Sequence, residues 1–340
     1  MPTRATGAQR TQVGLEATPG TPIAASKVLQ SLTVEMAPDV ESAAYRPRGS
    51  KYATVVAANK EWTAGDLEGT PTYDELVYVL ASVFGKPANP VQVMNGATAT
   101  GAYTWTFDTN SSAADVPATY TIEQGDATTA ERASSVVFTD FGLDFSRDEV
   151  TMSGSAIGGA LDRTLGALTT GATPVAADLV PILPGQVCVY LSSTQATLGQ
   201  AGTHLPTVVS VAPSVGGKYG PVWFLNCLVK GFSDVVEQSE PDFTVDLVAE
   251  ANASGRFYLD AFRSGATRFL RIEATGPQIM AGQAASAYRF TWDLAVKVLE
   301  PGEYSDEDGV YAVGPTLQVV HDPTWGRASR ITVVNKVAAL

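Results

Sequence analysis

The sequence offers few side chains of the kinds that carry out catalysis. His204 and His321, its two histidines, lie far apart, and neither has a cysteine or carboxylate at the spacing of metal ligands. Its two cysteines, Cys188 and Cys227, lie in apolar, strand-like runs, which is typical of buried free thiols in a reducing compartment. Neither a phosphate-binding glycine loop nor a nucleophile elbow is present. We therefore expect no enzymatic activity, no cofactor, and no catalytic or cofactor-binding residue.

Acidic residues are the second candidates for chemistry, and they concentrate between Glu300 and Asp308. A calcium loop needs oxygen ligands at regular positions. Placing Gly309 at the glycine that such a loop requires puts Tyr304 at the first ligand position and Pro315 at the last. We therefore interpret 300–309 as a solvated loop and assign no metal site. Two carboxylates could also serve glycoside hydrolysis, but the spacing singles out no pair.

Composition narrows the class of protein further. The 340 residues include 22 Lys and Arg against 35 Asp and Glu, a net charge of -13, and 45% are hydrophobic. This apolar content supports a folded core, and the excess of acids argues against a surface that grips nucleic acid phosphates. Charged residues, Gly or Pro interrupt the apolar runs well before the ~18 residues of a membrane span. No apolar run follows Arg4 and Arg10, so we expect no secretory signal.

Alternation of apolar and polar residues dominates the chain and predicts strands with one buried face. Tyr103, Trp105 and Phe107, for example, alternate with threonines and Asp108. The predicted strands lie near 29–36, 51–58, 103–107, 119–124, 141–145, 149–156, 187–192, 206–211, 222–233, 243–247, 267–274, 288–298, 310–321 and 330–337.

Two helices are predicted. In 72–84, Thr72 and Glu75 have the spacing of a capping box, one apolar stripe follows, and Gly85 ends the helix. The second helix, 255–264, begins after Ser254 and ends at Gly265.

The two helices start about half the chain apart, which suggests an internal duplication. The segments 137–156 and 228–251 also resemble each other as hairpins with acidic turns, although any β-rich protein contains such hairpins. The stretch 157–185 is rich in Gly and Pro, as linkers are. We predict a mainly β fold with two tandem β-sandwich or barrel domains, each with one flanking α-helix. The first domain spans 1–165, the linker 166–185, and the second domain 186–340.

Two segments of the sequence resemble phage major tail proteins, the tail tube subunits of long, non-contractile tails. The opening Gly14-Leu15-Glu16-Ala17-Thr18-Pro19-Gly20-Thr21-Pro22 is similar to the Gly-x-Glu-x-x-x-Gly-x-Pro start of many such subunits, whose N-terminal arm reaches between neighbours. The block 136–159 resembles their long hairpin strands. Beyond these two segments, the rest of the chain resembles the family only in its general pattern, and the resemblance includes no catalytic motif.

The resemblance implies a structural virion protein that assembles into stacked rings, the conduit for double-stranded DNA during ejection. It implies a place in the phage tail, after synthesis in the host cytoplasm. A chain with two tube domains would form homotrimeric, pseudo-hexameric rings; a homohexamer of one tube domain with an extra outer domain is the alternative. The partners implied are the tape measure, tail terminator and distal tail proteins, and DNA that passes without sequence-specific binding.

Two sets of residues follow as candidate sites. We expect lumen-facing acids on the strands 137–156 and 228–250, and ring contacts in the loops 37–50 and 300–309. The predicted lumen residues are Asp140, Asp144, Asp242 and Asp246, and the predicted inter-ring or inter-subunit residues are Arg46, Arg48, Glu303, Asp306 and Asp308. Other functions compatible with the sequence are a capsid decoration or adhesion protein built as a β-sandwich and, less favoured, a carbohydrate-active enzyme.

Overall fold

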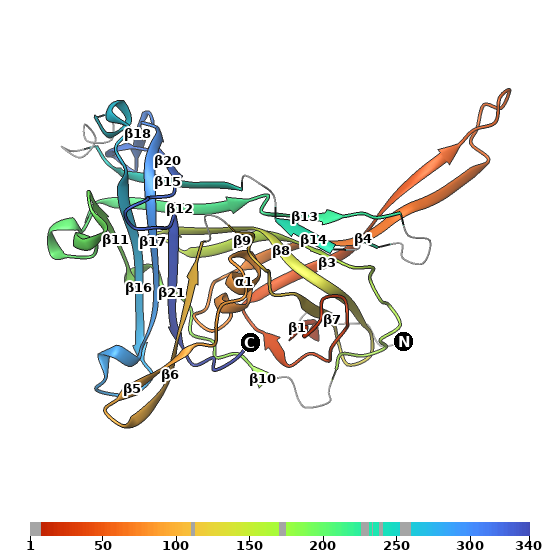
Figure 1. Cartoon of the computed structure of the whole chain (residues 1–340), viewed down its shortest axis with the longest axis horizontal. Helices are drawn as coiled ribbons and strands as arrows, with labels where there is room; N and C mark the ends of the chain where they lie inside the picture. Colours follow the sequence, from red (N-terminus) through yellow and green to blue (C-terminus); the bar gives the residue numbers. More distant parts are fainter. Residues whose placement is uncertain are drawn as a thin grey trace.

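The fold was analysed in a computed structural model, which describes residues 8–109, 113–169, 175–225, 231–232, 234–237, 241–251 and 260–340 (Figure 1). The protein is mainly β, with 55% strand, 8% helix, large antiparallel sheets and two short helices. This confirms the predicted mainly β class. None of the helices within the described ranges is long and apolar enough to cross a membrane.

The strands fall into an N-terminal and a C-terminal half of the chain, which meet in the Gly- and Pro-rich stretch 157–185. The N-terminal half contains β1 (Arg10–Leu15), β2 (Lys27–Leu29), β3 (Leu32–Tyr45), β4 (Val55–Gly69), α1 (Leu76–Val83), β5 (Val91–Asn95), β6 (Thr98–Asp108), β7 (Tyr120–Gly125), β8 (Ala130–Ser146), β9 (Val150–Gly158) and β10 (Val175–Ala176). The C-terminal half contains β11 (Val187–Ser192), β12 (Val208–Gly216), β13 (Tyr219–Val222), β14 (Asp234–Glu237), β15 (Asp242–Glu250), β16 (Arg268–Gln278), β17 (Ala287–Glu300), β18 (Tyr304–Glu307), β19 (Val310–Val313), β20 (Thr316–Val319) and β21 (Ser329–Asn335). Residues 260–264 are helical, and the start of that predicted helix, 255–259 with its cap Ser254, lies outside the described residues.

One order of antiparallel strands occurs twice. In the first repeat the order is β1-β7-β8-β9-β4-β3. In the second repeat it is β11-β16-β17-β20-β15-β12. In each repeat a long hairpin, β3–β4 or β12–β15, precedes the helix. Gly85 and Gly265, which follow the two helices, have φ of 87° and 60°, the left-handed backbone that favours glycine.

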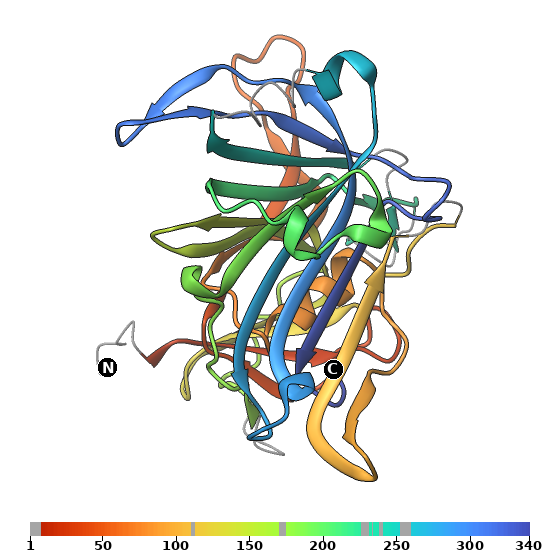
Figure 2. The ribbon, with the colours of Figure 1, turned by 90° about the vertical axis from the view of Figure 1, so that its left-hand side faces the viewer.

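Backbone pairing joins the two halves at two places. Strand β12 pairs with the second part of β8, where Val215 lies opposite Phe141. Strand β21, near the C-terminus, pairs with both β17 and β6. Figure 2 shows β16, β17, β21 and β6 side by side. Because strands on both sides of the predicted linker share a sheet, the halves do not fold as separately paired units in the described residues. The boundaries at 165 and 186 stay a prediction.

The described residues of the predicted linker, 166–185, pack against the first repeat and do not form an unattached connection. Strand β10 pairs with β2, and Leu168 and Ile182 are 6% and 1% exposed. The N–H of Tyr73 donates to the carbonyl of Val180 (3.1 Å). Glycine and proline predicted a linker here, but the apolar side chains between them hold the segment on the core.

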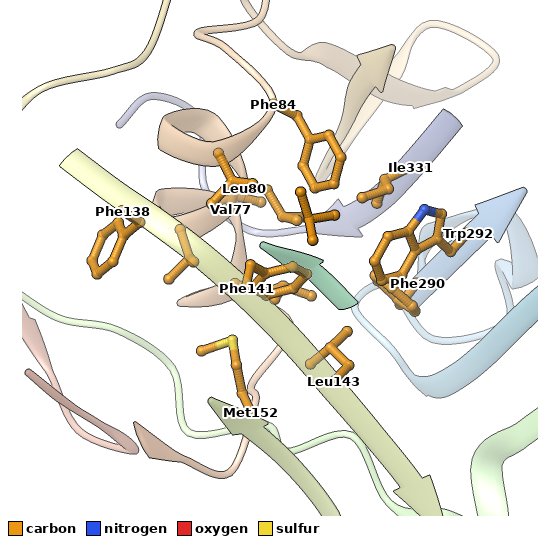
Figure 3. Packing of buried hydrophobic residues seen from close by; sticks show 14 of the residues in the cluster. Val77, Leu80, Phe84, Phe138, Phe141, Leu143, Met152, Phe290, Trp292 and Ile331 are labelled. Atoms are coloured by element: carbon orange, nitrogen blue, oxygen red, sulfur yellow. The ribbon is translucent and has the colours of Figure 1, made fainter. Parts of the chain in front are cut away.

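Helix α1 lies in the centre of one hydrophobic core. All eight of its residues are buried, although its sequence predicted a single apolar stripe. Phe84 contacts Phe141 of the first repeat and Trp292 of the second, with ring centroids 6.4 and 6.0 Å apart (Figure 3). Both repeats therefore enclose this helix, so the prediction of a flanking helix was wrong for α1.

The start of α1 contains half of the predicted capping box. The hydroxyl of Thr72 accepts the N–H of Glu75 (3.2 Å). The carboxylate of Glu75, which is fully buried, does not return to Thr72 but accepts the N–H groups of Gln30 (2.5 Å) and Ser31 (3.1 Å). Glu75 thus ties the helix to the turn before β3, because an unpaired carboxylate there would be costly.

Candidate functional site

The most distinctive surface is the solvent-facing side of a sheet that runs through both repeats. Its strands lie in the order β3-β4-β9-β8-β12-β15-β20-β17. Alternate side chains on these strands, such as Leu67, Leu143 and Leu247, are fully or almost fully buried against the core. The residues between them face outward, because successive side chains on a strand point to opposite sides.

The antiparallel register arranges these outward residues in three rows across the sheet. We call this surface the acidic face and define it by the rows. The rows are Glu35–Asp66–Ser155–Asp140–Gly216–Asp242, Thr33–Glu68–Ser153–Gly142–Ser214–Thr244–Gln318–Lys297, and Thr151–Asp144–Ala212–Asp246–Thr316–Glu300. Lys297 is the one basic residue in them. The face is therefore strongly negative, and apart from Gln318 and Lys297 its other residues are small or hydroxyl-bearing.

The acidic face brings together all four predicted lumen residues, Asp140, Asp144, Asp242 and Asp246. That they line a lumen stays a prediction. Sequence reasoning missed the other acids of the same face. They are Glu35, Asp66, Glu68 and Glu300. The alternation of the acidic Asp66 and Glu68 with the apolar Leu67 between them was the signal that could have found two of them.

Uncharged donors, and not cations, hold the carboxylates of this face. Asp140 accepts the N–H of Gly217 (2.6 Å) and the hydroxyl of Thr139 (2.7 Å). Asp246 accepts the hydroxyl of Thr316 (2.7 Å). Among the described residues, none of the ion pairs involves a carboxylate of the acidic face. No ion pair between described residues therefore neutralises its negative charge.

No set of metal ligands is found within the described ranges: three or more His, Cys, Asp or Glu side chains nowhere gather around one point. The acids of the face are spread along separate strands, in rows two residues apart on each strand. Such a surface offers repeated weak contacts over an area and not one chemical centre.

The hairpin β3–β4 forms an arm that leaves the body of the molecule (Figure 1). Strand β3 continues through 37–45, which pair with β4 in a long ladder, so the predicted loop 37–50 was wrong for 37–45; 46–50 lie in the connection between the two strands. The predicted contact residues Arg46 and Arg48 lie exposed in the connection between the two strands. Apolar side chains are exposed along the arm. They are Val40, Tyr45, Tyr52, Val55 and Val56.

Half of the predicted loop 300–309 is also strand. Residues 304–307 form β18, which pairs with β19, and the exposed Glu303, Asp306 and Asp308 lie in or beside this hairpin. Asp306 accepts the N–H of Gly309 (2.7 Å) across the turn. Figure 1 places β18 and the arm on opposite sides of the molecule, so one chain does not bring the two predicted contact groups together.

The predicted hairpin over 228–250 is paired differently from 137–156. Strand β15 pairs with β12 and β20, whereas β14 pairs with β13 as an extension of the β12–β15 hairpin. Residues 226–230, 233 and 238–240 lie outside the described residues.

The N-terminal motif 14–22 has an internal structural role. Strand β1 pairs with β7, and the buried carboxylate of Glu16 accepts the N–H of Gly20 (2.9 Å) and the hydroxyl of Thr121 (2.8 Å). Gly20 has φ of 81°, and a side chain at Gly14 would meet the Ala24 carbonyl at 2.8 Å. The described part of this segment therefore folds on its own subunit; residues 1–7 of the predicted arm lie outside the described residues.

Comparisons with known proteins assign no family. No protein-family model matches the sequence, and no curated protein is significantly similar to it. The function must therefore be argued from the acidic face, the arm and the repeated strand order.

Proposed function

We propose that this chain is a structural virion protein, the tail tube subunit of a long-tailed bacterial virus. Its acidic face lines the conduit through which double-stranded DNA leaves the virion. The observation that carries the proposal is one continuous, acid-rich and hydroxyl-rich sheet face. It spans two repeats that have the same order of strands. Two tandem tail-tube-type domains, joined by pairing between β8 and β12, would supply two neighbouring positions of a ring.

The electrostatics of the acidic face suit a conduit better than a binding site. Proteins that hold DNA neutralise its phosphates with Lys and Arg, and release of counterions then makes binding strong. A wall with four carboxylates in one row and three in another repels the phosphates and leaves the DNA hydrated. Small and hydroxyl-bearing neighbours such as Ser155, Gly142 and Ser214 leave the surface smooth, because they present no long side chain to the passing duplex.

The proposed assembly is a closed ring of three chains, in which six repeats complete one wall; six chains, each with one lining domain and one outer domain, is the alternative. Ring closure would pair sheet edges that otherwise invite uncontrolled association. The arm, with its exposed Tyr45 and Tyr52 and the cationic Arg46 and Arg48, would contact the next ring. In the virion the tube would end at the tape measure, terminator and distal tail proteins.

Negative-stain microscopy of the concentrated, purified protein tests the assembly. We expect stacked rings or tubes whose end views have threefold symmetry, with sixfold modulation from the two repeats. Sixfold symmetry with six chains per ring would favour the hexamer. A protein that remains monomeric at all concentrations would contradict the proposal and favour a decoration or adhesion protein.

Charge reversal tests the role of the acidic face. Replacing Asp140, Asp144, Asp242 and Asp246 with lysine changes the net charge from -13 to -5, because each substitution adds two positive charges. We expect tubes to form, to retain double-stranded DNA in a salt-dependent way, and to lower infectivity about tenfold or more. The four Asp→Asn substitutions are the control, and they should not retain DNA. Unchanged infectivity in the lysine variant would show that this face does not meet the DNA.

A further inference from the structure

The pairing between the two repeats is a complete example of how one repeat joins the next. The outer edge of β12 lies against the second part of β8, with Val211 opposite Phe145 and Val215 opposite Phe141. All four side chains are buried. The junction therefore extends both the sheet and its apolar underside from one repeat into the other.

The strands of this junction have counterparts in the opposite repeats. The pairing of β8 with β7 ends at Val136 and that of β17 with β16 at Val296, and each strand then contains a bulge, at Thr139 and at Leu299. The strands β18 and β19 continue the second hairpin beyond β17 and β20, as the last parts of β8 and β9 do in the first.

The register of the β12–β8 junction can be transferred to β3 and β17–β18 by following the residues with which equivalent positions pair. Gly69 and Ala249 each lie 16 residues before the glycine that follows the helix, Gly85 or Gly265, so we take them as equivalent. They pair with Met152 and Val313, which in turn pair with Leu143 and Tyr304. Tyr304 thus corresponds to Leu143, and Ser305 to Asp144. In the same way Leu67 pairs with Val34 and Leu247 pairs with Val211, so Glu35 corresponds to Ala212.

Both counterpart edges are open in the single chain. Among the described residues, β3 pairs along one edge with β4, and no strand pairs with its other edge. A groove of about 1130 Å³ follows the open edge, lined by residues 32–37 of β3 and by parts of β1, β2 and β7. Within the same described ranges, 297–300 of β17 pair only with β20 and β18 only with β19.

We propose that the open edge of β3 pairs with β17–β18 of a second copy of this chain, in the register of the internal β12–β8 junction. This inference rests on the proposed function and specifies its subunit contact. Glu35 would lie opposite Ser305, and Thr33 opposite Glu307. Each added copy would leave the same two edges open, so pairing continues until the ring closes.

The charges along the two edges select this register. On the outward face β3 carries Glu35, and β18 with its preceding turn carries Glu303 and Glu307. In the proposed register Glu35 faces an uncharged serine. A shift by two residues in either direction would place it directly opposite a glutamate, which is unfavourable, and a shift by one would turn apolar side chains outward.

The internal ladder is interrupted between the paired residues Val211 and Ser214 of β12, where Ala212 and Pro213 are skipped. Pro213 has no N–H to donate. Its counterpart on β3 is Met36, whose N–H and carbonyl are already bonded to the side chain of Gln124 (2.9 and 2.6 Å). The bond to Gln124 is therefore compatible with the same interrupted ladder.

Disulfide trapping tests the proposed contact. In a background with Cys188→Ser and Cys227→Ser, the variant Glu35→Cys/Ser305→Cys is oxidised mildly and separated on a non-reducing gel. We expect covalent dimers and trimers, because directly opposite residues have Cα atoms about 5 Å apart, within disulfide range. The matched control is the internal pair Ala212→Cys/Asp144→Cys, which should oxidise within one chain and run as a monomer.

An off-register variant and microscopy make the result decisive. Glu35→Cys/Lys297→Cys should give no covalent oligomer, since Lys297 lies about 25 Å along the strand from Ser305. If tubes form but Glu35→Cys/Ser305→Cys stays monomeric on the gel, this contact is wrong and the proposed function stands. If covalent oligomers form but no ring or tube is ever seen, the contact stands and the proposed function is wrong.

Discussion

The two repeats present the same kind of hairpin in two different states. The extension β13–β14 of the second repeat lies against the first: the rings of Trp223 and Trp62 are 5.7 Å apart, and the Lys60 ammonium lies 5.3 Å from the centre of the Trp223 ring. These contacts reach the β3–β4 hairpin of the first repeat only at Lys60 and Trp62. Among the described residues, the end of this arm beyond the Glu41–Lys60 pair has no such neighbour. Tyr52 at its end is 79% exposed.

The contrast indicates what the arm requires. The docked hairpin is held by buried contacts at its base, where the Nζ of Lys218 lies 2.7 Å from the Asp115 carboxylate and 5.1 Å from the centre of the Phe84 ring. An exposed hairpin with comparable apolar side chains would bury them by docking on a further copy of the chain. Under the proposed function, the docked hairpin corresponds to the contact that the end of the arm would make in the assembly.

Shortening the arm is the strongest way to break this comparison. Replacing residues 46–54 with Asn-Gly closes the hairpin directly at the Tyr45–Val55 pair with a favoured two-residue turn. We expect tube assembly to be lost in microscopy, while the free energy of unfolding in urea changes by less than about 1 kcal/mol. The variant Arg46→Gln/Arg48→Gln keeps the full length of the arm and removes the positive charges at its tip, so it separates the effect of charge from that of length. Normal tubes from the shortened protein would show that the arm is not a contact.

Removing the buried cation of the docked hairpin should have the next largest effect. Lys218→Met leaves Asp115 and Glu237 without the cation that lies between them, so we expect a loss of about 4 kcal/mol of unfolding free energy. Urea denaturation measures it. The matched control is Arg163→Met, which breaks the more exposed pair with Glu131 and should cost less than about 1 kcal/mol. Equal losses of unfolding free energy in the two variants would mean that the buried Lys218 ion pair stabilises the fold no more than an exposed ion pair does.

A pH titration tests the attachment of the C-terminal segment to the first repeat. Burial raises the pKa of Asp74 to about 6, although its Oδ1 accepts the N–H of Lys336 (3.1 Å); the nearby Asp178 raises the pKa further. Because the folded pKa exceeds the unfolded value near 4, the protonated form stabilises the fold below pH 4. This stability is lost as the pH rises towards 6.

The variant Asp74→Asn should remove this dependence, which is on the order of 2 kcal/mol between pH 4 and 6. Urea denaturation of both proteins across that range measures it. Asparagine keeps the acceptor for Lys336, so an unchanged pH profile in the variant would show that another group titrates.

Alternation predicted which side chains face outward because that direction depends only on a residue's place along its own strand. Asp140 and Asp144 are an even number of residues apart, as are Asp242 and Asp246, so each pair shares a face whatever strand lies beside it. This explains why the four predicted acids lie on one surface of the sheet.

Partners and lengths of strands could not be predicted in the same way. The alternation of β8 does not indicate that β12 is its neighbour, and that of β6 does not indicate that β21 is. Polar residues and Pro38 in 37–45 predicted a loop, but the ladder with β4 outweighs these weak local preferences. The enclosure of α1 was missed because strands from both repeats surround it. Tyr78 and Ser82 contact Tyr120 and Phe138 of the first repeat, whereas Phe84 contacts Trp292, which lies far along the sequence.

The covalent link between the repeats has a consequence for dilution. The β8–β12 joint forms within one chain, so its strength does not depend on protein concentration, whereas any joint between chains does. Fewer chains then lose translational freedom on assembly than if each repeat were a separate protein. Diluted or sheared assemblies should come apart only between chains, and every fragment should retain its repeats in pairs.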